Sequence, residues 1–140
     1  MVCRRGRFCC ANVEYCQLIN WDDYDHFSKQ EFDCQQTGEN EMRPAFVDKL
    51  QALRYEYGRP MIITSGYRSP WHSIESAKTQ PGAHASGQAC DIRVGPGEDV
   101  HALVTLAVRF GFTGIGISQR AGQPRFVHLD TLNRKAIWSY

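Results

Sequence analysis

The sequence lacks any long apolar run and any excess of charge of one sign. No apolar segment approaches the ~20 residues that a helix needs to cross a bilayer, which excludes an integral membrane protein. The chain has 16 Lys and Arg residues against 15 Asp and Glu residues, a formal net charge of +1. This balance gives no electrostatic reason to expect nucleic acid as a partner. The hydrophobic content of 42% excludes a disordered chain, which needs low hydrophobicity and high net charge.

The chain also lacks internal repeats, low-complexity tracts and a secretory signal. Its N-terminus carries the basic residues Arg4 and Arg5, but no apolar segment follows them. We therefore expect cytoplasmic synthesis, and a protein acting outside the cell would need holin-dependent release or transport in a virus particle. A length of 140 residues suits one domain and excludes two full enzyme domains.

Cysteines are distributed unevenly along the chain. Four of the 6 cysteines fall within the first 16 residues, at Cys3, Cys9, Cys10 and Cys16. Their spacing differs from the paired C-x2-C pattern of zinc fingers, so a small zinc knot and a loosely ordered or disulfide-pinned arm both remain open. We interpret residues 1–20 as a cysteine-rich N-terminal arm and residues 21–140 as one domain.

Hydrophobic periodicity predicts two main helices. The first begins near Pro44 and ends at Gly58, with apolar residues at helical spacing between them. The second begins near Glu98 and ends at Gly111. Between the helices, residues 66–87 are rich in glycine and proline and are expected to form a long irregular loop, which in a compact domain is usually functional.

Short apolar runs with β-branched residues predict the strands of one sheet. We expect strands over 60–64, 88–94, 114–118 and 125–130, with 136–140 as a further edge strand. This order of helices and strands predicts an α+β fold with a small, largely antiparallel sheet and helices on one face.

The two-residue period of a strand separates an apolar face from a polar face. Asp91 points away from the apolar neighbour Cys90, and His128 and Asp130 share one face of their strand. Gly114 and Gly116 lie on the polar face of the third strand, where we expect them to leave room for a substrate.

A candidate metal site emerges from three residues on or beside this polar face. His84 precedes Asp91 by seven residues, and Gly87 allows a sharp bend between them. With His128 they form two nitrogen ligands and one oxygen ligand, the composition of a catalytic zinc site with an open position for water. Taken singly, each has an ordinary alternative, because His84 could be a surface residue, Asp91 a capping acid and His128 a packed core imidazole.

These residues lie in segments that resemble the zinc D-Ala-D-Ala carboxypeptidase family, which includes small phage and bacterial D,D- and L,D-peptidases of the cell wall. The matching segments occur in the family's order. They are Ser-Gly-Tyr-Arg-Ser-Pro at 65–70, His-Ala-Ser-Gly-Gln-Ala-Cys-Asp at 84–91, Gly-Ile-Gly-Ile at 114–117 and Phe-Val-His-Leu-Asp at 126–130. Glu31-Phe32-Asp33-Cys34, the helix at 43–57 and Trp138 are also similar, so the resemblance covers residues 25–140.

The resemblance implies a hedgehog-like fold and a zinc ion held by His84, Asp91 and His128. It also places Arg68 near the substrate, holding either the scissile carbonyl oxygen or a substrate carboxylate. Family members commonly have an acid or histidine a few residues before the last ligand as the general base, but residues 119–126 contain neither. Asp130 is the nearest candidate, either as the base or as an acceptor that orients a ligating imidazole.

The implied activity is zinc-dependent hydrolysis of peptide bonds in the peptidoglycan stem, near a D-amino acid. Zinc would make a nucleophile from water at neutral pH, and Arg68 would help to stabilise the oxyanion that follows its attack. The protein would act as a D,D- or L,D-carboxypeptidase or endopeptidase, for example a phage lysin or a tail-associated hydrolase. Two alternatives use the same scaffold without catalysis: a zinc-stabilised binding module, or a virion structural protein cross-linked through the arm cysteines.

Overall fold

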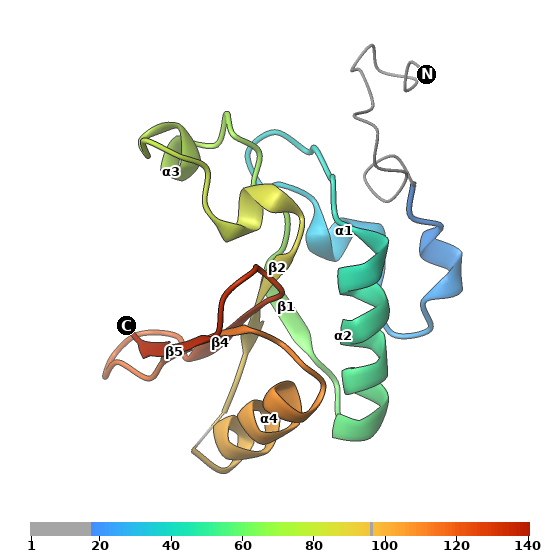
Figure 1. The fold of residues 1–140 in the computed structure, drawn as a ribbon, viewed down its shortest axis with the longest axis vertical. Helices are drawn as coiled ribbons and strands as arrows, with labels where there is room; N and C mark the ends of the chain where they lie inside the picture. The colour runs from blue at the N-terminus through green and yellow to red at the C-terminus, as the bar shows by residue number, and fades with distance from the viewer. Residues whose placement is uncertain (1–17, 96) are drawn as a thin grey trace.

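A computed structural model describes residues 18–95 and 97–140 (Figure 1). The four cysteines of the predicted arm lie outside these residues, so the zinc knot and the disulfide-pinned arm both stay predictions. Among the described helices, none is long and apolar enough to cross a membrane.

Eleven elements follow one another along the described chain. They are η2 Trp21–Asp23, α1 Lys29–Phe32, α2 Pro44–Tyr57, β1 Ile62–Ser65, α3 Ser73–Ser76, η3 Ala83–Ser86, β2 Ala89–Arg93, α4 Gly97–Arg109, β3 Gly114–Ser118, β4 Phe126–Asp130 and β5 Ala136–Ser139. Both main helices and all five strands match the elements expected from the sequence. The segment 66–87 is less irregular than expected, because it contains the short helices α3 and η3.

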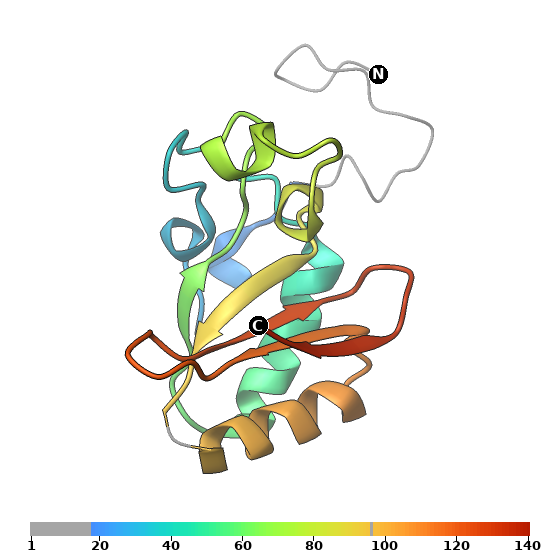
Figure 2. The ribbon, with the colours of Figure 1, turned by 90° about the vertical axis from the view of Figure 1, so that its left-hand side faces the viewer.

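The five strands form one sheet in the order β1-β2-β4-β3-β5. The first three pairings are antiparallel, and β5 pairs with β3 in parallel at the far edge. The prediction of an α+β fold with a largely antiparallel sheet is therefore confirmed. Figure 2 looks onto the sheet with α2 behind it, while η3 and α3 lie beyond one end of β1 and β2.

The main helices begin and end where the sequence signals predict. Pro44 occupies the first turn of α2, and Gly58 ends it in the left-handed conformation with φ 68°, donating its N–H to the Arg54 carbonyl at 3.1 Å. Gly111 likewise follows α4 with φ 81°. Both helices contribute fully buried leucines, Leu50 and Leu103 among them, to the single core.

The sheet gives one face to this core and leaves the other for polar chemistry. Cys90 and Ile92 of β2, Ile115 of β3, and Val127 and Leu129 of β4 are all buried in the core cluster. The predicted alternation is therefore correct on three strands, and the side chains between these positions point toward the opposite face.

The segment before α2 anchors the loop that follows β1. Phe32 is fully buried, and its carbonyl accepts the N–H of Tyr67 at 2.8 Å. At Gly66 a Cβ atom would lie 2.5 Å from the Phe32 Cα, so only glycine permits this approach. This contact fixes the backbone next to Arg68.

Candidate metal centre

One row of paired residues crosses the polar face of the sheet. Asp91 on β2 pairs with His128 on β4, and His128 pairs with Gly116 on β3. Gly116 in turn pairs with Trp138 on β5. Because directly paired residues point to the same face, the acid and the imidazole are neighbours by register alone.

His84 reaches this row from η3, just before β2 begins. Gly87 ends η3 in the left-handed conformation with φ 75°, and a Cβ atom there would lie 2.1 Å from the Glu41 carbonyl oxygen. The chain therefore turns tightly against its neighbour at this point, as the sequence predicted for Gly87. The buried His84 imidazole is held by its Nδ1, which lies 2.8 Å from the Gly66 carbonyl oxygen.

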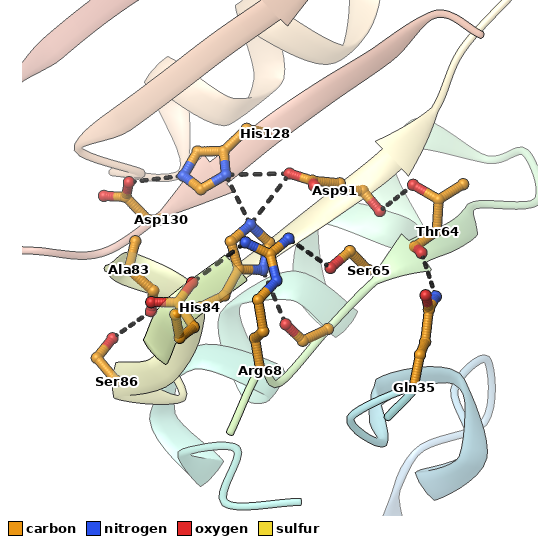
Figure 3. A network of polar contacts seen from close by, with 12 residues as sticks. Gln35, Thr64, Ser65, Arg68, Ala83, His84, Ser86, Asp91, His128 and Asp130 are labelled. Atoms are coloured by element: carbon orange, nitrogen blue, oxygen red, sulfur yellow. Dashed lines mark hydrogen bonds and ion pairs between the residues drawn. The ribbon is translucent and has the colours of Figure 1, made fainter. Parts of the chain in front are cut away.

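The structure brings His84, Asp91 and His128 together (Figure 3). The Asp91 Oδ1 lies 3.0 Å from the His128 Nδ1 and 3.3 Å from the His84 Nε2. The two imidazole nitrogens are 3.2 Å apart. Tetrahedral zinc ligands with bonds of about 2.0–2.1 Å lie roughly 3.3 Å from one another, so these three atoms already have the spacing of a coordination sphere.

The hydrogen bonds around the two imidazoles decide which nitrogens can bind a metal. The Gly66 carbonyl can only accept, so the His84 Nδ1 carries the proton and the Nε2 keeps its lone pair. The Asp130 Oδ2 accepts from the His128 Nε2 at 2.8 Å, which leaves the His128 Nδ1 as a lone pair. Two lone pairs and the Asp91 carboxylate then converge with no proton between them, and a cation fits this donor set.

Burial and charge act in opposite directions on these groups. Burial by itself would raise the pKa of Asp91, but where protons on His128 and His84 take the place of a cation, their hydrogen bonds and charge hold this pKa well below its usual range. Burial would lower the pKa of His128, and the carboxylates of Asp130 and Asp91 raise it instead. Because metal ligation needs the unprotonated imidazole, a cation at this site competes with a proton.

Asp130 lies on the far side of His128 from the other two candidate ligands. It is fully buried and accepts four hydrogen bonds, which come from the His128 Nε2, both terminal nitrogens of Arg134 and the Leu132 N–H. Burial would raise its pKa, yet these donors lower it, so the carboxylate stays ionised. This position suits an acceptor that orients the imidazole.

The expectation that the glycines of β3 leave room for a substrate is wrong. A Cβ atom at Gly116 would lie 2.7 Å from the Trp138 indole, and one at Gly114 would lie 2.3 Å from the Asp130 carboxylate. The protein's own side chains therefore occupy the space that the missing Cβ atoms leave. Period-2 alternation identifies the face of a strand but not the neighbour that covers it.

Arg68 is drawn with the candidate ligands in Figure 3, and both its backbone and its guanidinium are hydrogen-bonded. Its N–H donates to the His84 carbonyl at 3.2 Å. Its guanidinium donates to the Ser65 hydroxyl at 3.2 Å and to the Glu75 carboxylate at 3.2 Å. The anchored guanidinium is pre-organised for an oxygen anion of a substrate.

Glu75 is a buried acid in α3 that sequence reasoning missed, because no periodicity in residues 66–87 predicts this short helix. Its side chain is 0% exposed and accepts from Arg68, from the Lys78 ammonium at 2.9 Å and from the Gly82 N–H at 2.7 Å. Burial would raise the pKa of Glu75, but these three donors lower it. Glu75 thus ties Arg68 to the loop that carries His84.

Replacing Glu75 by glutamine is expected to destabilise the fold by about 1–3 kcal/mol at pH 7. The lowered pKa means that the ionised carboxylate stabilises the fold above the unfolded pKa of about 4.3, and that this contribution is lost as the pH falls through the folded pKa. Urea unfolding with chelator present should therefore show a smaller difference between E75Q and the parent chain at pH 3 than at pH 7.

The matched control for this change is E56Q, because Glu56 makes an exposed ion pair with Arg109 at 3.7 Å. Exposed pairs contribute about 0–1 kcal/mol, so E56Q should change the free energy of unfolding little at either pH. An equal loss in E75Q at pH 3 and pH 7 would show that the charge of Glu75 does not stabilise the loop.

The remaining histidines and Cys90 take ordinary positions. His101 is exposed on α4. Cys90 is fully buried on the core face, as expected for the apolar neighbour of Asp91. His72 is buried and accepts the Ile74 N–H at the start of α3. Trp138, whose ring centroid lies 5.3 Å from that of His128, covers one side of this imidazole.

Comparison with known proteins is consistent with this arrangement. The profile of a family described as Peptidase M15 matches residues 24–130, which include Arg68 and all three candidate ligands. Among curated proteins, no sequence matches the chain significantly. The family match covers well over half of the chain and agrees with the resemblance seen in the sequence motifs. The chain therefore belongs to the peptidase M15 family, the zinc D-Ala-D-Ala carboxypeptidase-like peptidases.

Proposed function

We propose that the chain hydrolyses a peptide bond in the peptidoglycan stem, next to a D-amino acid, with a zinc ion held by His84, Asp91 and His128. The observation that carries this proposal is the convergence of two imidazole lone pairs and one carboxylate within 4.8 Å of one another. Membership of a family of zinc-dependent peptidases supports the same reaction.

The three candidate ligands suit a catalytic ion better than a structural one. A zinc ion held by these three residues would keep a fourth position for water, whereas structural zinc sites are closed and usually rich in cysteine. A zinc ion held there supplies Lewis acidity, which makes a nucleophile from water near neutral pH. The Gly66 carbonyl and Asp130 keep each imidazole in the tautomer that turns a lone pair toward the ion.

Arg68 is the group of this chain placed to bind the substrate's oxygen atoms. Its Nη1 and Nη2 make one contact each, to Glu75 and Ser65, so further N–H donors of the guanidinium remain for the scissile carbonyl oxygen or a carboxylate. Glu75 and Lys78 fix this position, because the buried acid is shared between the two cations. A pre-organised donor of this kind stabilises a developing oxyanion without rearranging.

Asp130 acts in this proposal as a positioning residue rather than as the general base. Substituting it by asparagine (D130N) is expected to weaken zinc binding about 10- to 100-fold, as measured by competition with a chromophoric chelator. Every neighbour of the carboxylate is a donor, so the amide nitrogen would face the His128 Nε2 or Arg134 and disturb the tautomer of His128.

The control for D130N is D48N, since Asp48 is exposed on α2 and accepts only the Tyr24 hydroxyl at 2.6 Å among the contacts found. D48N should bind zinc like the parent chain. Unchanged zinc affinity in D130N, together with lost turnover and a missing acid limb in the pH profile, would instead identify Asp130 as the base.

A second candidate function has one observation in its favour. Among the described residues near the candidate ligands, both other buried acids are engaged, Asp130 by His128 and Arg134, and Glu75 by Arg68 and Lys78. A site without a free proton carrier would suit a zinc-stabilised module that binds stem peptides without cutting them.

Digestion of purified muropeptides, followed by mass spectrometry, separates the two candidates and names the bond. We expect the zinc-loaded protein to release a fragment with a new free amine, and a chelator to abolish the release until zinc is restored. Intact muropeptides that nevertheless co-elute with the protein would establish the binding module and overturn the proposed hydrolysis.

A further inference from the structure

A pocket of about 470 Å³ opens at the hairpin that joins β3 to β4. Its lining includes Ser118 at the end of β3, Phe126 at the start of β4, Arg120 and Gln123 of the hairpin, and Tyr140 just after β5. Sites for small molecules usually have volumes of ~300–1,000 Å³. The pocket therefore has room for a ring with its substituents.

The pocket lies on the same face of the sheet as the candidate ligands. Phe126 and His128 are two residues apart on β4, so their side chains point to one face and are roughly 7 Å apart along the strand. Aromatic rings connect the two places. The Trp138 ring centroid lies 5.3 Å from that of His128 and 6.3 Å from that of Tyr140. A substrate cut at the candidate ligands would thus bring a neighbouring group to the pocket.

The lining combines an aromatic surface with hydrogen-bonding side chains. Phe126 is half-buried, Tyr140 is 46% exposed, and their ring centroids lie 5.1 Å apart. Arg120 and Gln123 are exposed on the hairpin and supply N–H donors and an amide oxygen. No acid is among the described residues that line the pocket. This lining suits a group that is apolar on one face and carries hydroxyl and amide groups at its edge.

The proposed substrate contains one group of this kind. The residues of a stem peptide, which are alanine, glutamate, and lysine or diaminopimelate, have no large apolar side chain to cover the two aromatic rings. The N-acetylmuramic acid that carries the stem is a ring with apolar C–H faces, bordered by hydroxyl groups and an N-acetyl group. Stacking such a face on Phe126 and Tyr140 removes apolar surface from water, while Arg120 and Gln123 can pair with the edge.

We propose that this pocket binds the N-acetylmuramic acid residue to which the stem is attached, so that the protein prefers stems still linked to the glycan. The inference rests on the proposed function, because it names the part of the substrate that is recognised beside the same site. The distance of roughly 7 Å between Phe126 and His128 along β4 is spanned by about two extended residues. The proposal therefore favours cleavage of a bond near the sugar over cleavage of the terminal D-Ala-D-Ala bond.

Two synthetic ligands with the same pentapeptide isolate the contribution of the sugar. The first is N-acetylmuramyl-L-Ala-γ-D-Glu-L-Lys-D-Ala-D-Ala, and the second carries D-lactic acid in place of the muramic acid, so it lacks only the sugar ring. With zinc-loaded protein we expect kcat/KM to be about tenfold higher for the first ligand, mainly through a lower KM, because the ring is bound both before and during the reaction. Isothermal titration calorimetry of the metal-free protein should show the same preference in Kd without any cleavage.

Replacing Tyr140 by alanine tests the aromatic surface of the pocket. We expect Y140A to lose most of the preference for the muramyl ligand, whereas Y140F keeps the ring and should keep the preference. Y55A is the matched control, since Tyr55 is an exposed tyrosine of α2. R120A removes a hydrogen-bonding group from the exposed hairpin and should lower the preference about threefold, which provides a second test should Y140A fail to fold.

The outcomes separate the sugar site from the proposed hydrolysis. Cleavage with equal kcat/KM and equal Kd for the two ligands would overturn the sugar site and leave the hydrolysis standing. A preference in binding that Y140A removes, without cleavage of either ligand, would support the sugar site and overturn the hydrolysis. A preference that a folded Y140A and R120A both retain would place the sugar elsewhere and overturn the pocket. Neither cleavage nor preference would overturn both proposals.

Discussion

Replacing His128 by alanine is expected to lower zinc affinity by about 10²- to 10³-fold and to reduce peptide hydrolysis below detection. Structural zinc sites with four ligands contribute roughly 10–16 kcal/mol, which is about 2.5–4 kcal/mol per ligand. The His128 Nδ1 lies 3.0 Å from the Asp91 Oδ1, so its loss would open the coordination sphere of a bound zinc ion on the β4 side. Equilibrium dialysis against zinc, read by atomic absorption, measures the loss directly.

The result for H128A needs a control for folding, because His128 is buried and supports Asp130. H101A removes an exposed imidazole from α4 and should retain about one zinc per chain. H128Q keeps most of the volume and allows unfolding curves to be compared with the metal-free parent chain. Full zinc occupancy in a folded H128A or H128Q would remove His128 from the site.

The sequence predicts the candidate ligands because strand periodicity determines which side chains share a face. Alternation alone places Asp91 and His128 on the polar face, and the register makes them direct neighbours across β2 and β4. His84 follows from Gly87, whose left-handed conformation turns the chain at the start of β2. These are local rules, and they apply before any tertiary contact is known.

The supporting residues could not be predicted in the same way, because tertiary contacts place them. Glu75 and His72 belong to a loop segment whose short helix α3 depends on contacts with Gly82 and with its own cap. The space beside Gly116 is filled from β5, which lies far along the chain and joins the sheet by parallel pairing with β3. No periodicity in the sequence encodes which strand becomes a neighbour.

Substituting Arg68 by alanine is expected to lower kcat/KM about 10²- to 10³-fold, the loss typical of removing one donor to a developing oxyanion. We expect kcat to fall and KM to rise together, because the guanidinium that Glu75 and Ser65 anchor would contact both the bound substrate and the developing oxyanion. R68K separates charge from geometry. Lysine can keep an ion pair with Glu75 but not the forked donors, so the activity of R68K should lie between those of R68A and the parent chain.

R59A is a matched control, since Arg59 pairs with Asp99 at a partly exposed site. Zinc content should be unchanged in all three variants. If the kcat/KM of R68A stays within about threefold of the parent value, the loss is well short of that expected for an oxyanion donor, and Arg68 is excluded from the reaction.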